Sequence, residues 1–386
     1  LGPEGNYLGE FGPYFTDRYR TPWGKAINFD GPESDQVREY FIQNALYWTI
    51  DCGLDGLRLD AVHAMYDHTA HTFLQELVER VHAAGDAVGR RILLIAESSD
   101  NDPRLVRSPS AGGIGLDGCW NDDYHHAIRT TLTDERRGYY SAFRGIDMVG
   151  DAVRNRFVYT GGYQPHCRRR HGAPALDIPH HRFVVFTQNH DQVGNRPFGD
   201  RFDRVAGLDG ARLAAALALL SPFTPLLFMG EEYAEPAPFP YFVSHDDPDL
   251  VAAVRKGRRE EFADLHGAAD PPDPQAESTF SSARLDWSLR EHEPHRRMLA
   301  WYAHLLAVRR RFAIGLRAVL DCAVDDARST LVTVLDGSPR LLVAVNVGTE
   351  PQIVEPSCAR GLWTPIVDGS DPAFGHGGDR MSLDSE

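Results

Sequence analysis

The chain has 386 residues, of which 42% are hydrophobic and 25% are charged, and its formal net charge is −15. A single core stops growing near ~250–300 residues, so we expect one large domain and one smaller domain. The basic residues are dispersed, so no face suited to nucleic acid is predicted. The longest apolar stretch is interrupted by prolines and falls short of the ~20 residues that span a bilayer.

Two helices are predicted in the first quarter of the chain. Apolar residues recur at helical spacing from Val37 to Trp48, before Gly53, and again over residues 70–84, before Gly85. A third helix is predicted over residues 294–312.

Short apolar runs alternate with the helical segments, at residues 56–59, 91–97, 115–120, 182–188 and 224–230. Continuous apolar strands between helices indicate a parallel sheet that is buried on both faces. Polar residues follow each run directly, and in a (β/α) barrel this edge of the sheet carries the active site. A doubly wound sheet uses the same edge but would need a Gly-rich phosphate turn, which follows no early strand here. We therefore predict a (β/α) barrel.

The pattern changes after the third helix. Residues 329–347 alternate in polarity and turn at Asp336-Gly337, which is a hairpin signature. We expect a barrel domain over residues 1–313 and a small antiparallel β domain, a β-sandwich, over residues 314–386.

The five cysteines are far apart and lack CxxC spacing, so neither disulfides nor a zinc site is predicted. A reducing compartment fits this pattern, and we expect a cytoplasmic protein. The histidines and acids show no HExxH or EF-hand motif, so we expect no metal ion and no cofactor.

Three acids stand directly beyond strand cores: Asp60, Glu97 and Asp191. Taken singly, each is more simply read as a solvated carboxylate at the start of a loop. Taken together they suggest a site, because each has a distinctive neighbour. Arg58 shares a strand face with Asp60 and would keep that acid ionised. Glu97 follows an apolar run, whose low polarity would keep Glu97 protonated. His190 precedes Asp191 and can donate to a sugar hydroxyl.

A charged acid beside a neutral acid is the arrangement that breaks a glycosidic bond. A retaining mechanism places the two carboxyl groups about 5–5.5 Å apart. We expect Asp60 to be the nucleophile and Glu97 the general acid and then base. Asp191 would bind ring hydroxyls and favour the distorted sugar.

These segments resemble a known family. Residues 56–63 (GLRLDAVH), 93–98 (LLIAES) and 188–196 (QNHDQVGNR) are similar to three of the four signature regions of the α-amylase family of retaining glycosidases. The resemblance implies a (β/α)8 TIM barrel followed by a C-terminal β domain. It also places His63 in a substrate-contacting motif.

Finer features resemble one branch of that family, the maltooligosyltrehalose trehalohydrolases. They are the segments at residues 21–31 (TPWGKAINFDG), 120–129 (WNDDYHHAIR) and 241–262 (YFVSHDDPDLVAAVRKGRREEF). This branch cleaves the α-1,4 bond next to a terminal trehalose unit and releases trehalose and a maltooligosaccharide. The resemblance implies these sugars as ligands, with no nucleic acid and no membrane.

Two other functions stay open. A glycogen branching enzyme shares part of the motifs. A non-catalytic glycan-binding barrel is more remote, because it would be expected to lose one of the acids or Arg58.

The sequence departs from the family at its start. The family carries another signature region just before the loop at residues 2–8, and the first barrel strands are missing from this chain. Five strands cannot close an eight-stranded barrel. We expect the N-terminal part of the same protein to exist as a separate chain or to have been cut away.

Two further residues are candidate substrate contacts. Trp120 could present its ring to a sugar face or pack in the core. Asp123 could read trehalose hydroxyls or cap the next helix, and we favour the binding role. We expect His63 to lie near the leaving-group sugars.

Overall fold

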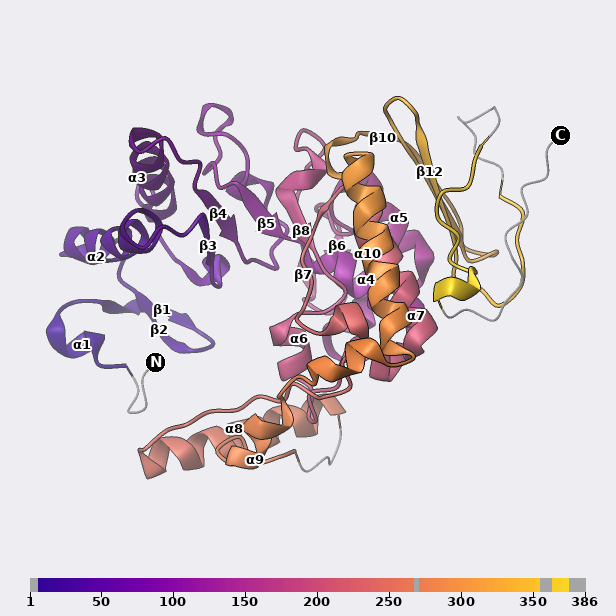
Figure 1. The fold of residues 1–386 in the computed structure, drawn as a ribbon. Helices are drawn as coiled ribbons and strands as arrows, with labels where there is room; N and C mark the ends of the chain where they lie inside the picture. The colour runs from indigo at the N-terminus through magenta and orange to yellow at the C-terminus, as the bar shows by residue number, and fades with distance from the viewer. Residues whose placement is uncertain (1–5, 267–270, 355–362, 375–386) are drawn as a thin grey trace.

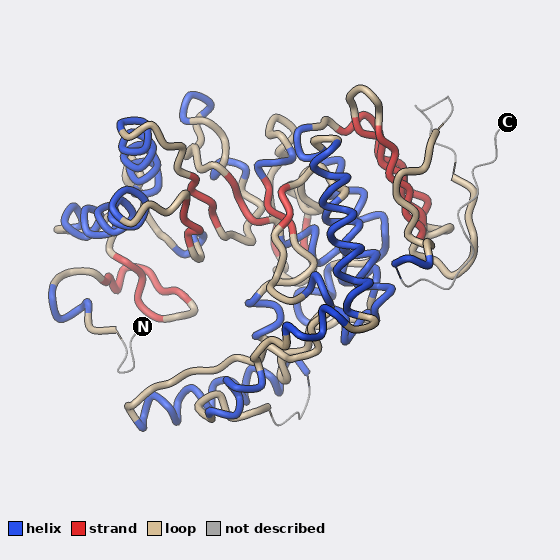
Figure 2. Tube along the Cα trace, in the orientation of Figure 1, coloured by secondary structure: helices blue, strands red, loops and turns tan. Residues whose placement is uncertain are grey.

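A computed structural model describes residues 6–266, 271–354 and 363–374 (Figure 1). A parallel sheet and its helices occupy the centre, and a small antiparallel sheet lies at the C-terminal side. Figure 2 shows strands at the centre with helices around them.

The central sheet consists of five parallel strands that lie side by side in chain order: β3 (Gly56–Leu59), β4 (Leu93–Ala96), β5 (Gly118–Trp120), β8 (Phe183–Val185) and β9 (Thr224–Pro225). Each strand falls within one of the predicted apolar runs. Within the described residues, β3 and β9 are the outer strands and do not pair with each other, so the sheet is open.

The two faces of this sheet pack against different neighbours. On the outer face, Leu94, Phe183 and Val185 join the main hydrophobic core with the surrounding helices. On the inner face a separate apolar cluster forms, made of Ile95, Trp120, Val184, Phe186 and Leu226. Successive side chains of a strand alternate between faces, so residues in phase with Ile95 project into the inner face. Arg58 is the register partner of Ile95 and therefore belongs to the inner face.

Each of the three predicted helical segments coincides with a helix that packs around the sheet. The three helices match residues 37–48, 70–84 and 294–312, namely α2 (Ser34–Leu46), α3 (Phe73–Ala87) and α10 (His295–Arg311). A capping box formed by Thr72 and Gln75 starts α3. The others are α4 (Asp122–Leu132), α5 (Gly145–Asn155), the short α6 (His190–Gly194) and α7 (Phe202–Leu219).

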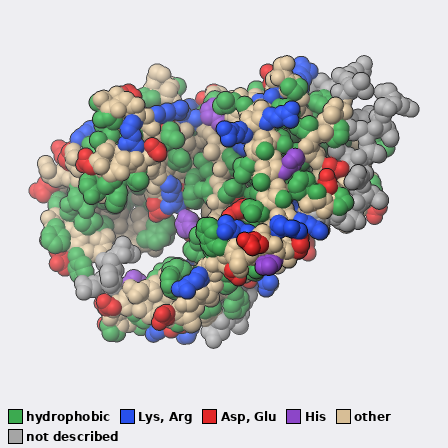
Figure 3. Space-filling view, viewed as in Figure 1, with side chains coloured by type: hydrophobic (Ala, Val, Ile, Leu, Met, Phe, Trp, Pro, Cys, Tyr) green, Lys and Arg blue, Asp and Glu red, His purple; other side chains and the backbone are tan. Residues whose placement is uncertain are grey.

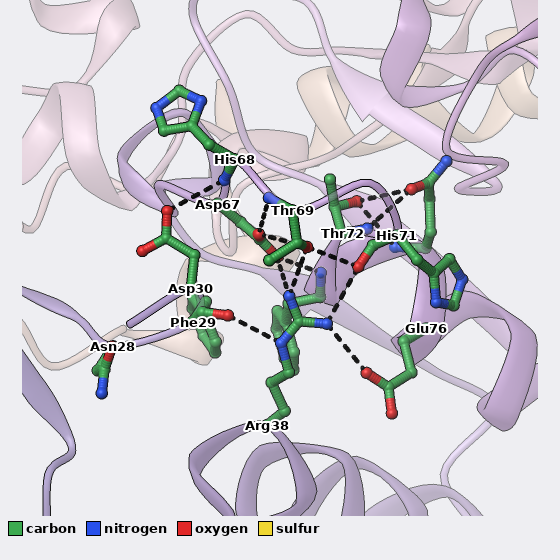
Figure 4. Close-up of polar contacts among 12 residues, drawn as sticks. Asn28, Phe29, Asp30, Arg38, Asp67, His68, Thr69, His71, Thr72 and Glu76 are labelled. Atoms are coloured by element: carbon green, nitrogen blue, oxygen red, sulfur yellow. Dashed lines mark hydrogen bonds and ion pairs between the residues drawn. The ribbon is translucent and has the colours of Figure 1, made fainter. Parts of the chain in front are cut away.

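A buried arginine fastens α2 to the segment that follows β3 (Figure 4). Arg38 donates to the Phe29 carbonyl at 2.8 Å, the His71 carbonyl at 3.1 Å, Asp67 at 2.5 Å and Glu76 at 3.2 Å. Removing one partner of such a buried ion pair leaves the other charge uncompensated. The network therefore fixes the course of the chain directly beyond the strand that ends at the candidate site.

Two peripheral segments flank the sheet. The first is the N-terminal lobe, with α1 (Leu8–Phe11) and the hairpin of β1 (Phe15–Thr21) and β2 (Gly24–Ile27). The second is a helical arm of α8 (Pro248–His266) and α9 (Glu277–Ser282), which extends along the lower edge in Figure 1. Figure 3 shows the surface hollowed between the lobe and the arm. A minor hairpin pairs β6 (Tyr163–Gln164) with β7 (Arg169–Arg170).

The described strands of the C-terminal region form one antiparallel sheet of β10 (Val319–Asp325), β11 (Thr330–Leu335) and β12 (Leu341–Asn346). The predicted hairpin is the β11–β12 pair, and Gly337 takes a positive φ of 131° in its turn. The sheet packs on α5, where a Cβ at Gly150 would lie 2.3 Å from Val324 Cγ2. The domain boundary after residue 313 stays a prediction, and residues 355–362 and 375–386 lie outside the described part.

Cys52, Cys119, Cys167 and Cys322 are free thiols, and Cys358 lies outside the described residues. In the part of the chain that the structure describes, no group of three or more His, Cys, Asp or Glu side chains could hold a metal ion. Over the same residues, every helix is too short or too polar to cross a membrane.

Candidate active site

The end of β3 places Arg58 and Asp60 on the same face, as the two-residue spacing predicts. The Arg58 Nη1 donates to Asp60 Oδ1, and the guanidinium lies over the Trp120 ring at 4.5 Å from its centroid. The Asp60 side chain is 76% exposed, so its carboxylate opens toward solvent. An accessible carboxylate oxygen held by one guanidinium is suited to attack a ligand that enters from that side.

Glu97 follows β4 and reaches the same arginine. Its Oε2 lies 3.7 Å from Arg58 Nη2, and its side chain is 15% exposed. The same oxygen accepts a hydrogen bond of 2.5 Å from the backbone N–H of Ala61. The two carboxylates therefore contact the two terminal nitrogens of one guanidinium, one from each neighbouring strand.

The turn after Asp60 supports this arrangement. Ala61 has left-handed backbone angles, φ 45° and ψ 45°, which cost energy for a residue with a Cβ. This conformation aims its N–H at Glu97, and the next N–H, of Val62, donates to the Glu97 carbonyl at 3.1 Å. These two hydrogen bonds tie the chain beyond β3 to the end of β4. The expected contrast between a charged Asp60 and a neutral Glu97 stays a prediction.

The third acid stands at the start of α6. Asn189 caps this helix by accepting from the N–H groups of Asp191 and Gln192, at 2.9 and 3.1 Å. Asp191 Oδ1 accepts a hydrogen bond of 2.9 Å from Asn195 Nδ2. His190 is exposed, and its ring centroid lies 6.3 Å from that of Trp120 on the inner face.

Asp60 and Glu97 thus follow β3 and β4 and contact the same inner-face arginine, Arg58, whereas Asp191 follows β8 on α6 and contacts Asn195. This geometry provides an accessible carboxylate, a less exposed carboxyl group beside it, and a third acid with hydrogen-bonding capacity. Such a set can supply a nucleophile, a proton donor and a hydroxyl ligand to one sugar.

No family model matches the sequence. It is 45% identical over 352 residues to the malto-oligosyltrehalose trehalohydrolase of Arthrobacter ramosus, covering 90% of this chain and 60% of that protein. It is 41% identical over 315 residues to the enzyme of the same name from Saccharolobus solfataricus, covering 82% and 53%.

A solved structure agrees with these relatives. A provisionally named α-amylase from Salmonella typhimurium is 34% identical, with a TM-score of 0.81 over 92% of this chain and 62% of that chain. The chain belongs to the α-amylase family. An α-amylase from H. orenii, at 18% identity and a TM-score of 0.54 over 91% of this chain and 62% of that one, shares the fold.

Membership of the α-amylase family confirms the predicted fold class, with the described strands forming an open part of the barrel. The chain spans less than two thirds of the length of the relatives just named.

At the start of α4, the neighbouring acids Asp122 and Asp123 have different environments, which the sequence alone did not reveal. Asp123 is 3% exposed, and its Oδ2 accepts from Asn101 Nδ2 at 2.7 Å and from the N–H groups of Val158 and Tyr159 at 2.9 Å each. These bonds give Asp123 an internal structural role. Its expected contact with a sugar stays a prediction.

Asp122, by contrast, belongs to the electrostatic surroundings of the site. Burial is the main reason that the pKa of Asp122 is raised to about 8. The charges of Glu97, Asp123 and Asp191 contribute to this rise, and Arg58 opposes it.

Trp120 is 6% exposed and packs edge-to-face with Phe186, with ring centroids 5.3 Å apart. The Arg58 guanidinium lies over the Trp120 ring, so this ring packs against one face of the guanidinium. The expected stacking of Trp120 on a sugar stays a prediction.

His63 is exposed on the short helical turn after β3, and a second aromatic residue lies near it. Trp23, in the β1–β2 turn, is 71% exposed, and its ring centroid is 6.4 Å from that of His63. Trp23 was not among the predicted site residues, although a tryptophan in a Thr-Pro-Trp-Gly turn is a recognisable signal.

Replacing Asp122 with Asn is expected to change how stability depends on pH. The ordinary pKa of aspartate is about 3.9, so between pH ~4 and 8 the folded state holds a proton on Asp122 that the unfolded state has lost. Stability from this group therefore falls as pH rises through that window. The melting temperature of Asp122→Asn, measured by calorimetry from pH 5 to 8, should rise relative to wild type as pH increases.

The matched control for this measurement is Asp86→Asn, which changes an exposed carboxylate on α3. Its melting temperature should track that of wild type across the range. A constant offset between Asp122→Asn and wild type over the whole range would contradict the expectation.

Proposed function

We propose that this chain carries the catalytic site of a retaining glycoside hydrolase. Its reaction would be the cleavage of the α-1,4-glucosidic bond next to the terminal trehalose of maltooligosyltrehalose. The observation that carries the proposal is the 45% identity to a named trehalohydrolase over 90% of the chain. The convergence of Asp60 and Glu97 on Arg58 supports it independently.

The reaction follows from the positions of the acids. Asp60 attacks the anomeric carbon of the maltooligosaccharide unit, while Glu97 gives its proton to the bridging oxygen and trehalose leaves. A water molecule then attacks the glycosyl ester on Asp60, and Glu97 takes the water proton. The ester breaks, the maltooligosaccharide is released, and both acids return to their starting states.

The surrounding residues have separate roles in this proposal. Arg58 orients Asp60 and contacts Glu97. Asp191 and His190 bind hydroxyls of the sugar that is attacked. His63 and the exposed Trp23 face the departing trehalose, since an aromatic ring covers the apolar side of a pyranose.

We also propose the catalytic region as residues 1–313 and the β domain as residues 314–386, with the maltooligosaccharide and trehalose as the small-molecule ligands. Cytoplasmic location is part of the proposal and is supported by the free thiols of Cys52, Cys119, Cys167 and Cys322.

The deciding experiment incubates the full-length protein with maltotriosyltrehalose. Release of free trehalose and maltotriose is expected. A second function has a specific observation behind it, because the sequence is 27% identical over 241 residues to a 1,4-alpha-glucan branching enzyme of Mycobacterium ulcerans. New α-1,6 branches on amylose without trehalose release would favour that enzyme. No change in either substrate would favour a non-catalytic glycan-binding barrel.

A further inference from the structure

Asp191 stands on a short helix and has few neighbours on that helix to orient its side chain. The helix α6 has five residues, and Asp191 is its second residue. Asn189 holds the backbone at the start of α6. The side chain of Asp191 depends on a different group, the amide of Asn195 at 2.9 Å.

A residue from the helical arm completes this contact. Arg258 on α8 donates from Nη1 to Asn195 Oδ1 at 2.9 Å and from Nη2 to the Gly194 carbonyl at 2.9 Å. The guanidinium therefore binds both the last residue of α6 and the side chain that follows it. The two ends of the contact with Asn195 lie 63 residues apart in the sequence.

The chemistry of the arginine sets the orientation of the amide. A guanidinium can only donate hydrogen bonds, whereas an asparagine amide has one accepting and one donating end. With its oxygen turned to Arg258, Asn195 must present its NH₂ group to Asp191. Without Arg258, the amide oxygen would lose this partner, and the side chain of Asn195 would be held less firmly against Asp191.

The arginine is itself held in place. Its guanidinium carbon lies 4.4 Å from the centroid of the Tyr241 ring, in a cation–π contact. Tyr241 precedes α8 in the chain. The arm thus places the oriented guanidinium of Arg258 against the end of α6. The catalytic roles proposed for the acids do not explain why this contact exists.

We propose that Arg258 is a positioning residue for catalysis, which fixes the amide of Asn195 so that this amide orients the Asp191 carboxylate toward the sugar. The inference rests on the proposed glycosidase function, in which Asp191 contacts the substrate. It makes the arm of α8 part of the catalytic apparatus, although no residue of α8 takes part in bond making or breaking.

The test measures kcat and KM for trehalose release by the Arg258→Met, Asn195→Ala and double variants. Arg258→Met is expected to lower kcat about 10- to 100-fold, since small misplacements of a catalytic group cost up to ~10²-fold in rate. Because Arg258 acts through Asn195, the double variant should be no slower than Asn195→Ala alone within about twofold. Losses that multiply in the double variant would mean that Arg258 only supports the fold, and would overturn the proposal.

A conservative variant and a matched control sharpen the result. Arg258→Lys keeps one donor for Asn195 but lacks the fork that also reaches Gly194, so its kcat should lie between those of Arg258→Met and wild type. Arg255, one turn earlier on α8, pairs with Asp273 at 2.7 Å. Arg255→Met removes the same charge from the same helix and should keep the wild-type kcat. A wild-type kcat for Arg258→Met would also overturn the proposal.

A second readout separates this inference from the proposed function. The side-chain amide signals of Asn195 in a ¹H–¹⁵N spectrum, assigned by their loss in Asn195→Ala, should shift in Arg258→Met and stay in place in Arg255→Met. If wild type releases no trehalose, the proposed function fails, and these signals still decide whether Arg258 orients Asn195. Unshifted signals in Arg258→Met would overturn the inference even in an active enzyme.

Discussion

Replacing Asp60 with Asn is expected to lower kcat for trehalose release by on the order of 10⁴-fold or more, because the change removes a catalytic nucleophile. Asparagine has nearly the same shape, and its amide oxygen can still accept from Arg58. The lower kcat would therefore come from a slower bond-cleavage step, and KM should change little. Single-turnover kinetics with maltotriosyltrehalose measure the rate of this step directly.

The same strand offers a matched control for Asp60. Asp55 precedes β3 at its amino end, is 95% exposed and pairs with Arg90 at 3.1 Å. Asp55→Asn should keep the wild-type kcat, since the amino ends of the strands lie away from the candidate site. A kcat of Asp60→Asn within tenfold of wild type would exclude Asp60 as the nucleophile.

The covalent step gives an independent check on the role of Asp60. A substrate whose glycosyl ester is hydrolysed slowly should leave one glycosyl unit on the peptide that contains Asp60, detectable by mass spectrometry. A label on a different acid would reassign the nucleophile without changing the reaction class.

Much of the central sheet could be predicted from the sequence, because its signals are local. The run at residues 56–59 coincides with β3, and period-two alternation already placed Arg58 and Asp60 on one face. The cap formed by Thr72 and Gln75 and the apolar spacing after it similarly define α3. In these elements the chemistry and the fold are decided by residues within a few positions of each other.

The contacts that complete the site are long-range, and for that reason the sequence did not reveal them. Arg58 was expected to serve Asp60 alone, yet it also reaches Glu97 on the next strand. Asp123 looked as available as Asp122, but it is enclosed by a loop 35 residues further along the chain. Asn195 did carry a local signal, since it follows Asp191 by four residues at helical spacing, whereas its partner Arg258 did not.

Replacing Glu97 with Gln is expected to lower kcat for maltotriosyltrehalose by at least ~10²-fold, since general acid catalysis contributes about 10²–10⁴-fold. Glutamine can still accept from the Ala61 N–H, so the turn after Asp60 should keep its shape. The loss should nevertheless depend on the leaving group. Trehalose needs a proton as it departs, whereas fluoride leaves without one.

An α-maltosyl fluoride substrate therefore separates the two halves of the reaction. In Glu97→Gln the first step should proceed at nearly the wild-type rate with this substrate, and the glycosyl ester on Asp60 should accumulate because no base activates water. The exposed Glu79 on α3, whose side chain is 60% exposed, provides the control Glu79→Gln, with wild-type rates for both substrates. An equal loss with both substrates would show that Glu97 positions the sugar without transferring a proton, and the double-displacement mechanism would then need a different acid.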